Sequence, residues 1–178
     1  MLMLASHNIL NPANGAPIAV PSQDMVLGLY YITKGKKSTK EDVVKGEGGI
    51  FYSPEEVIIA YNEGKLDLHA HVKVKTYDLG ADGQPCLMMV ETTCGRVMFN
   101  NKVPLQVGFI NDVMTKKALR DIIGEVLKVC GTSRTAQFLD DIKDLGFQMA
   151  YKGGLSMGLG DVLVPDNKEV MVDKAKEE

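Results

Sequence analysis

The chain has 178 residues, enough for one domain or two small ones, and its 45% hydrophobic and 24% charged residues are typical of a soluble globular protein. A formal net charge of −3 at pH 7 excludes a bulk electrostatic attraction to nucleic acid, because binding to phosphates requires a basic surface. No apolar run approaches the roughly 20 residues that span a bilayer. The three cysteines share no C-x-x-C spacing, which favours free thiols in a reducing, cytoplasmic compartment.

The segment from 8 to 31 is rich in turn-forming residues and poor in charge. Asn14-Gly15 predicts a tight turn, because both residues tolerate positive φ. Residues 18–20 lie between two prolines and predict a short extended segment. Ser22 stands where a helix N-cap belongs, with Gln23 and Asp24 in the first turn, and apolar residues follow at helical spacing. Turn chemistry alone explains most such segments; the alternative is a functional polar corner backed by an apolar helix.

Residues 34–49 are charged and Gly-rich without periodicity, which predicts a mobile loop. The lysines of this loop stand beside acidic residues, which favours a solvated loop over a phosphate contact. Ser53 and Glu56 form a capping-box pattern around Pro54, and Gly64 follows the last turn. These signals predict a short structural helix.

The middle of the chain carries the pattern of a β-hairpin. Apolar and polar residues alternate from Leu66 to Lys75, which predicts a strand with one buried face. Asp82-Gly83 predicts the turn, and residues 86–99 predict a returning strand that bends at Gly95. We therefore expect a small antiparallel β unit here.

Two helices are predicted next. Thr115 caps the first, which carries an apolar stripe and ends at Gly131. The second covers residues 134–151, with Gly146 placed to interrupt it. Because only a few residues connect them, an antiparallel helix pair is expected. The Gly-rich residues 153–160 then predict a flexible connection.

The residues of the chain offer little chemistry by themselves. His69 and His71 have a spacing that can hold a metal, but Lys73 and Lys75 share their strand face, so a solvated polar face is the better interpretation. The aspartates of the second helix lie opposite its apolar stripe, which favours a solvated face over a magnesium or acid–base site. Arg96 suits either an anion contact or an interaction with a neighbouring domain. We expect no catalytic residue and no metal or other cofactor bound by this chain.

A series of motifs in this sequence resembles the bacterial RNA polymerase β′ subunit family. The resemblance covers nearly the whole chain in the right order, which makes it far more specific than any single motif. The stretches that carry it are NILNPANG, PSQD-x-VLGLYY, GEGGIF, LHAHVKVK, TTCGRVMFN, VGFIN, KKALRDIIGEVLK, FLDDIKDLGF and GGLSMGLGDVLVP.

The resemblance implies an excised fragment of a larger chain, namely the pore domain running into the start of the rim helices. The expected fold class is α+β, with a small antiparallel β unit, several short helices and an antiparallel helix pair. The expected divisions are 1–33 next to the active centre, 34–110 with the loop, short helix and β unit, 111–160 with the helix pair, and 161–178 with the start of the rim helix.

The resemblance further implies a role in transcription by the multisubunit DNA-directed RNA polymerase, a nucleotidyltransferase. This part would form the wall of the secondary channel, through which nucleotides enter and the RNA 3′ end is extruded. The aspartate loop that holds magnesium would lie outside the fragment, as would zinc, so the fragment alone should be inactive. The channel-facing candidates are Asn11, Asn14, Ser22, Gln23 and Asp24.

The implied partners are the rest of β′, the β, α and ω subunits, nucleoside triphosphates, RNA and DNA, and transcript-cleavage factors at the outer opening near Asp161. No membrane partner is expected. The alternative hypothesis is a free-standing α+β protein-interaction module without catalysis. An isolated fragment should expose apolar patches that its missing neighbours cover, so we expect it to self-associate, and to bind DNA only weakly.

Overall fold

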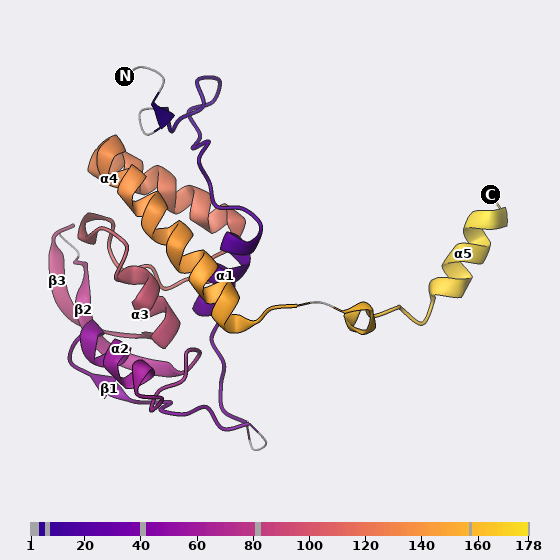
Figure 1. Ribbon diagram of the computed structural model, residues 1–178, viewed down its shortest axis with the longest axis horizontal. Coiled ribbons are helices and arrows are strands. Elements are labelled where there is room, and N and C mark those ends of the chain that lie inside the picture. The colour runs from indigo at the N-terminus through magenta and orange to yellow at the C-terminus, as the bar shows by residue number, and fades with distance from the viewer. Residues whose placement is uncertain (1–3, 6–7, 40–41, 81–82, 157, 178) are drawn as a thin grey trace.

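The computed structural model describes residues 4–5, 8–39, 42–80, 83–156 and 158–177, and its fold is α+β, as predicted. Figure 1 shows the sheet at one side of the body and the long α4 at the other, with α1 and α3 between them. In chain order the elements are α1 (Asp24–Thr33), β1 (Ile50–Phe51), α2 (Pro54–Asn62), β2 (His71–Leu79), β3 (Pro85–Thr93), α3 (Cys94–Asn100), the 3-10 turn η2 (Leu105–Val107), α4 (Lys116–Gly153), the 3-10 turn η3 (Leu159–Asp161) and α5 (Lys168–Glu177).

The sheet has the strand order β1-β2-β3. β2 and β3 form the expected antiparallel hairpin, with Val74 opposite Val90, and β1 adds a short parallel strand that the sequence did not reveal. The predicted start of the strand is wrong, because β2 begins at His71 and not at Leu66. Leu66 and Leu68 are buried in irregular backbone ahead of the strand, so their alternation reflects packing rather than a pleat.

The hairpin turn itself lies partly outside the described residues, because Asp82 is not among them. Gly83 has φ +69, and its N–H donates to the carbonyl of Gly80 at 2.9 Å. Gly83 therefore has the positive φ that a glycine tolerates best.

The predicted strand over residues 86–99 is wrong in its second half, because β3 ends at Thr93 and α3 follows at once. The Thr93 side chain caps α3 by accepting a hydrogen bond from the Arg96 N–H at 3.4 Å. Gly95 is not a strand bend. A Cβ at this position would lie 1.8 Å from the carbonyl oxygen of Ile32, so glycine is what lets α3 touch the end of α1.

The antiparallel helix pair is present as the two arms of α4, which fold back along each other in Figure 1. The two arms meet at Gly131, whose backbone angles of φ 75 and ψ 177 are not helical. Thr115 caps the first arm as predicted, because its hydroxyl accepts from the Ala118 N–H at 3.2 Å. Gly146 does not interrupt the second arm; it is buried inside the helix.

Two hydrophobic clusters form the interior. The larger joins α1, α3 and α4 around Phe99 and Phe138, and the smaller lies between the sheet, α2 and α3 around Val57 and Val74. Tyr61 packs against both clusters. The helical layers and the sheet therefore share a continuous interior, which fixes α1 relative to the rest of the body.

The segment before α2 also follows the prediction in part. No helix or strand forms among the described residues of 34–49, but the loop is anchored: Val44 is buried and its N–H donates to Ser38 Oγ at 3.0 Å. Ser53 caps α2 by accepting from the Glu56 N–H at 3.3 Å.

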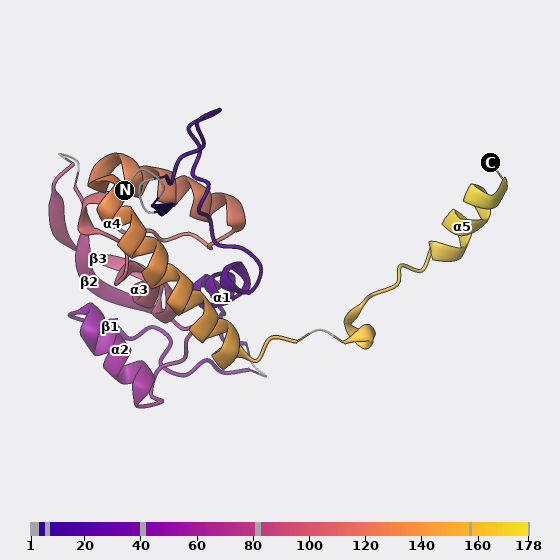
Figure 2. The same ribbon diagram turned by 45° about the horizontal axis from the view of Figure 1, so that its top comes forward.

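The chain beyond α4 leads away from the body. Figures 1 and 2 both show α5 standing apart, and residues 154–156 and 158–176 are all exposed. The helix expected to open at residues 166–169 is present as α5. Among the described residues, no helix is long and apolar enough to cross a membrane.

Candidate functional site

The N-terminal polar segment folds into a small hairpin. Leu10 and Pro17 form an antiparallel bridge, and the Ile18 N–H donates to the Ile9 carbonyl at 2.8 Å. Gly15 at its tip has φ +66, and no atom lies within 4 Å of the place where a Cβ would stand. The predicted tight turn is confirmed, and its tip points into open space.

The side chains of Asn11 and Asn14 each close a local turn. Asn11 Oδ1 accepts from the Ala13 N–H at 3.0 Å, and Asn14 Oδ1 accepts from the Ala16 N–H at 3.1 Å. Both are therefore side-chain mimics of a backbone turn. Their oxygens serve the hairpin, and their amide nitrogens have no partner within the described residues.

The start of α1 differs from the prediction, because Ser22 is not a side-chain cap. Gln23 holds the cap position, and no side-chain hydrogen bond closes the helix start. Gln23 has φ 50 and ψ −122, and the Ser22 carbonyl accepts from the Met25 N–H at 3.2 Å. These angles belong to the first central residue of a type II′ turn, a position that favours glycine.

Gln23 is the single non-glycine residue with positive φ in the described part of the chain. A residue held in this conformation costs on the order of 1–3 kcal/mol and persists where the surrounding structure forces it. The strain at Gln23 therefore has to be offset by the packing of the helix that follows it.

Ser22, Gln23 and Asp24 form an exposed polar corner. Within the described residues, their side chains make no hydrogen bond or ion pair. Directly behind them, α1 is anchored by Leu29 and Ile32, which are fully buried. The corner thus presents hydrogen-bond donors and acceptors that have no partner in the described chain, and a packed helix supports them. Such a support can hold polar groups in a fixed position.

An apolar depression of about 430 Å³ opens beside Gln23. The start of α4 supplies its far wall, and this start is tied to α1 by the Met114 N–H, which donates to Thr33 Oγ1 at 2.9 Å. The sequence analysis missed this wall, because some 80 residues separate it from α1 and only the cap signal at Thr115 marked it. The lining residues are Gln23, Val26, Leu27, Tyr30, Met114, Thr115 and Lys116.

Arg96 is used inside the fold. Its Nε donates to the Thr33 carbonyl at 3.0 Å and its Nη1 donates to Asn111 Oδ1 at 3.0 Å. Asn111 also accepts from the Thr92 hydroxyl at 2.8 Å and donates to the Glu91 carbonyl at 2.9 Å. Burial lowers the pKa of the Arg96 guanidinium. The network ties α1, β3 and α3 together, and an anion or domain contact by Arg96 stays a prediction.

The two histidines are less solvated than expected. His69 Nδ1 lies 2.8 Å from the Lys34 carbonyl oxygen, and the imidazole meets the Tyr31 ring edge-on at 4.7 Å. His69 and His71 are both half-buried. Among the described residues, no three His, Cys, Asp or Glu side chains gather as a metal site would require.

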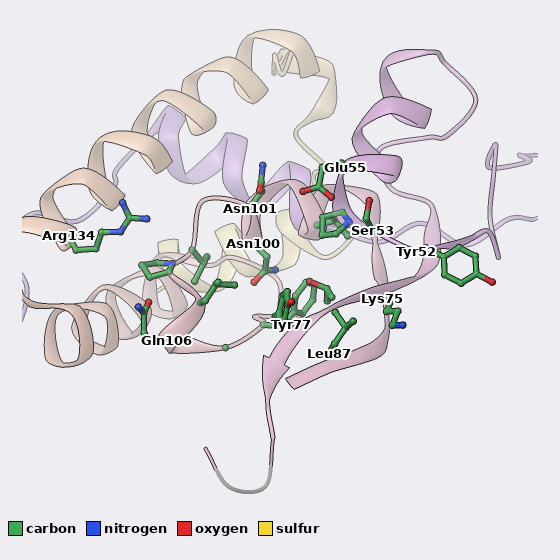
Figure 3. A pocket seen from close by; sticks show the side chains of 18 residues that line it. Tyr52, Ser53, Glu55, Lys75, Tyr77, Leu87, Asn100, Asn101, Gln106 and Arg134 are labelled. Carbon is green, nitrogen blue, oxygen red and sulfur yellow. The ribbon is translucent and has the colours of Figure 1, made fainter. Parts of the chain in front are cut away.

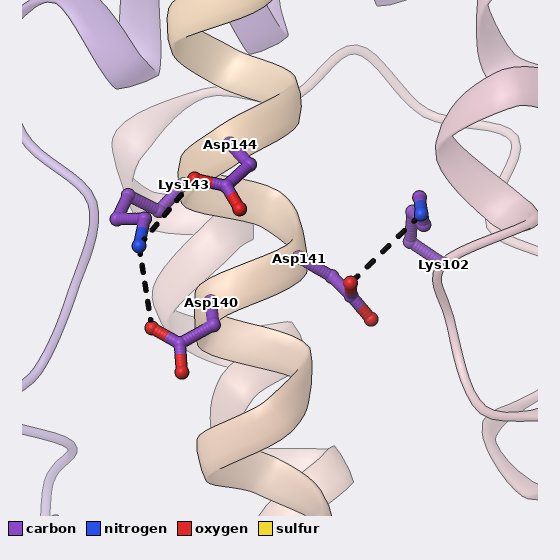
Figure 4. A network of polar contacts seen from close by, with 5 residues as sticks. All are labelled: Lys102, Asp140, Asp141, Lys143 and Asp144. Atoms are coloured by element: carbon purple, nitrogen blue, oxygen red, sulfur yellow. Dashed lines mark hydrogen bonds and ion pairs between the residues drawn. The ribbon is translucent and has the colours of Figure 1, made fainter.

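The aspartates of the second α4 arm take part in ion pairs (Figure 4). Lys143 bridges Asp140 and Asp144 at 3.5 and 3.4 Å, and Lys102 lies 3.8 Å from Asp141. Because these carboxylates are exposed and pair with nearby lysines, the arrangement is that of a solvated, ion-paired helix face, as predicted.

A pocket of about 550 Å³ lies on the sheet side, and none of its lining residues belongs to the polar corner (Figure 3). The start of α2, the middle of β2 and the loop around η2 enclose it, and Arg134 closes one end. Nothing in the sequence marked this pocket, because its walls come from distant parts of the chain. It holds no pair of acid and base side chains within hydrogen-bonding distance.

The sequence model of the family "RNA polymerase Rpb1, domain 3" matches residues 8–162, so the chain belongs to this family of RNA polymerase domains. More particularly, it is similar to the DNA-directed RNA polymerase subunit beta′ of several bacteria. The identity is 62% to that of Parabacteroides distasonis over 100% of this chain, 62% to that of Porphyromonas cangingivalis over 98%, and 54% to that of Flavobacterium johnsoniae over 100%.

The chain spans only 12–15% of the length of these relatives. The predicted resemblance to the bacterial β′ subunit is therefore confirmed, as is the prediction that the chain corresponds to one part of a larger β′ chain.

Proposed function

We propose that this chain forms part of the secondary-channel wall in a DNA-dependent RNA polymerase. In this role it shapes the path by which nucleoside triphosphates enter and the RNA 3′ end leaves. The observation that carries the proposal is the corner at Gln23: a strained backbone, an exposed side chain with no internal partner, and a rigid helix behind it. These are the properties of a residue held in place for an external ligand.

The chemistry of the corner favours positioning over catalysis. Gln23 offers a neutral amide that both donates and accepts, which suits a nucleotide base, sugar or phosphate. Asp24 beside it carries a negative charge that disfavours a bare phosphate chain, so the hydrogen bonds fall to Gln23 and to the free amide nitrogens of Asn11 and Asn14. Magnesium and the catalytic carboxylates belong to other parts of the polymerase in this proposal, so the chain alone makes no RNA.

The partners follow from the same proposal. The remaining β′ chain and the β, α and ω subunits surround this part, and DNA is held elsewhere in the enzyme. The exposed segment from Asp161 onward borders the outer opening and offers transcript-cleavage factors a surface. Purified alone, the chain should bind DNA weakly; template-dependent nucleotide incorporation by the pure chain would contradict this division of roles.

The experiment replaces Gln23 in the whole polymerase. Gln23→Ala removes the carboxamide and keeps the strain, whereas Gln23→Gly removes the carboxamide and relieves the strain. If the carboxamide positions nucleotides, both variants raise the KM for nucleoside triphosphates several-fold during elongation. Asn62→Ala, at an exposed position in the last turn of α2, is the matched control. If both Gln23 variants elongate and recover from backtracking as Asn62→Ala does, the corner does not face the channel.

A further inference from the structure

The sheet has an open edge on the β1 side. β2 runs for nine residues, but β1 pairs with it over only two, Ile50 and Phe51. The chain leaves the sheet after Phe51 because Ser53 and Pro54 start α2. The far half of β2 is therefore without a neighbouring strand on this side.

The hydrogen-bond pattern shows which groups face the open edge. The His71 carbonyl accepts from the Gly48 N–H at 2.8 Å, and the Lys73 N–H donates to Gly49 at 2.9 Å, so alternate residues of β2 point their backbone groups toward the β1 side. Tyr77, opposite Leu87, is separated from Lys73 by an even number of positions, so its backbone N–H and C=O point toward the same side. No hydrogen bond among the described residues satisfies its backbone N–H or C=O.

The pocket on the sheet side lies at this edge. Figure 3 shows Tyr77 and Lys75 on the strand, with Ser53 and Glu55 at one end and Gln106 and Arg134 at the other. A volume of about 550 Å³ is in the range of preformed binding sites.

The walls of the pocket are held by paired hydrogen bonds. Asp78 Oδ1 accepts from the Phe109 N–H at 2.9 Å and from the Leu79 N–H at 2.7 Å. The side chain of Asn100 makes two bonds of 2.7 Å to the backbone of Ile110. The gap beside Tyr77 is thus built into the fold and bounded on both sides.

Exposed apolar side chains stand among the polar residues that line the gap. Of the residues that line it, Tyr52 is 73% exposed and Leu105 60%, and Tyr77 and Leu87 are each about half exposed. Free backbone groups flanked by apolar pockets are the features that recruit an added β-strand, with main-chain bonds for affinity and side-chain pockets for specificity.

We propose that an extended segment of the same longer polypeptide, from outside residues 1–178, adds a strand to β2 at Tyr77 and fills this pocket. The related β′ chains place 85–88% of their length outside the matched part, since the chain spans 12–15% of them. A segment tethered to the same chain binds at a high effective concentration, so a few backbone bonds suffice. The inference rests on the proposed place of this chain within a polymerase subunit.

The test measures amide exchange in the assembled polymerase. Thr76, whose backbone pairs with Met88, is the internal reference for a strand amide. Deuterium exchange with single-residue fragmentation should show the Tyr77 amide slowed at least a hundredfold relative to an unstructured peptide, as Thr76 is. Exchange of Tyr77 at the unstructured rate would overturn the proposal.

A second measurement identifies the occupant. A photo-crosslinking amino acid at Leu105, whose side chain is exposed at the rim, should attach to a peptide of the same β′ subunit outside these residues. Attachment to another subunit, or to nothing, would contradict the proposal. Neither outcome depends on the Gln23 variants, so the strand addition and the channel-wall role can fail separately.

Discussion

Gly28 of α1 and Gly146 of α4 face each other where the two helices cross. A Cβ on Gly28 would lie 2.0 Å from the Gly146 carbonyl oxygen, and a Cβ on Gly146 would lie 2.8 Å from the carbonyl oxygen of Met25. The helices therefore meet backbone to backbone, which no larger residue permits. This crossing fixes the position of α1 against α4. It therefore also fixes the position of the polar corner, which lies at the start of α1.

Gly28→Ala should therefore destabilise the fold by about 3 kcal/mol or more, since the added methyl cannot be accommodated without separating α1 from α4. Gly124→Ala, in α4, is the matched control, because its Cβ would meet only Pro17 Cγ at 3.9 Å. We expect Gly124→Ala to stabilise the chain by about 0.5–1 kcal/mol, as glycine-to-alanine changes do in helix interiors. Urea unfolding measures both; equal effects would contradict the crossing.

Gln23→Gly should raise the free energy of unfolding by about 1 kcal/mol or more, because glycine adopts φ 50 and ψ −122 without strain. Gln23→Ala should not raise the free energy of unfolding, because alanine keeps the Cβ that causes the strain. The two thermal midpoints are the measurement. A Gln23→Gly variant no more stable than Gln23→Ala would show that the turn is unstrained.

Cys94 should make the fold sensitive to alkaline pH. Burial raises the pKa of its thiol from 9.0 to about 12. Above pH 9 the thiol ionises in the unfolded chain but not in the folded one, so the stabilisation present below that pH is lost as the pH rises toward 12. By pH 10 the loss is about 1.4 kcal/mol.

The measurement is urea unfolding at pH 8 and pH 10. Cys94→Ala should lose about 1.4 kcal/mol less than the parent between these two pH values. Cys86→Ala, at an exposed cysteine, should lose as much as the parent. Parallel pH profiles for all three chains would refute the role of Cys94.

Arg96→Lys should destabilise the chain by about 1–3 kcal/mol, because a lysine ammonium cannot reach both the Thr33 carbonyl and the Asn111 side chain in the geometry of a guanidinium. A double-mutant cycle with Asn111→Ala checks this, since the two residues share one bond and their effects should not add. Additive losses would mean that the observed contact contributes nothing.

The ion-paired aspartates should not bind magnesium. Asp140→Asn should change stability by less than about 0.5 kcal/mol, because its partner Lys143 is exposed and still pairs with Asp144. Addition of millimolar Mg²⁺ should leave the thermal midpoint of the parent and of this variant unchanged. A saturable shift in the parent that Asp140→Asn abolishes would establish a metal site instead.

Local signals in the sequence determined the turn at Gly15, the caps at Ser53 and Thr115, the apolar stripes of α4 and the break at Gly131. Each of these depends on residues within a few positions of one another, so periodicity and capping chemistry suffice. The family resemblance, which rests on the order of residues alone, was likewise available from the sequence.

Only the tertiary structure decided the rest. Residues 94–100 have the apolar composition of a strand, but they form a helix in which Gly95 lies against the carbonyl of Ile32 in α1, far away in the chain. The wall at Met114 and the open edge at Tyr77 depend on segments that are far apart in the chain. Long-range packing overrides local propensity, because the stability of an element depends on which surfaces it buries, and distant segments supply those surfaces.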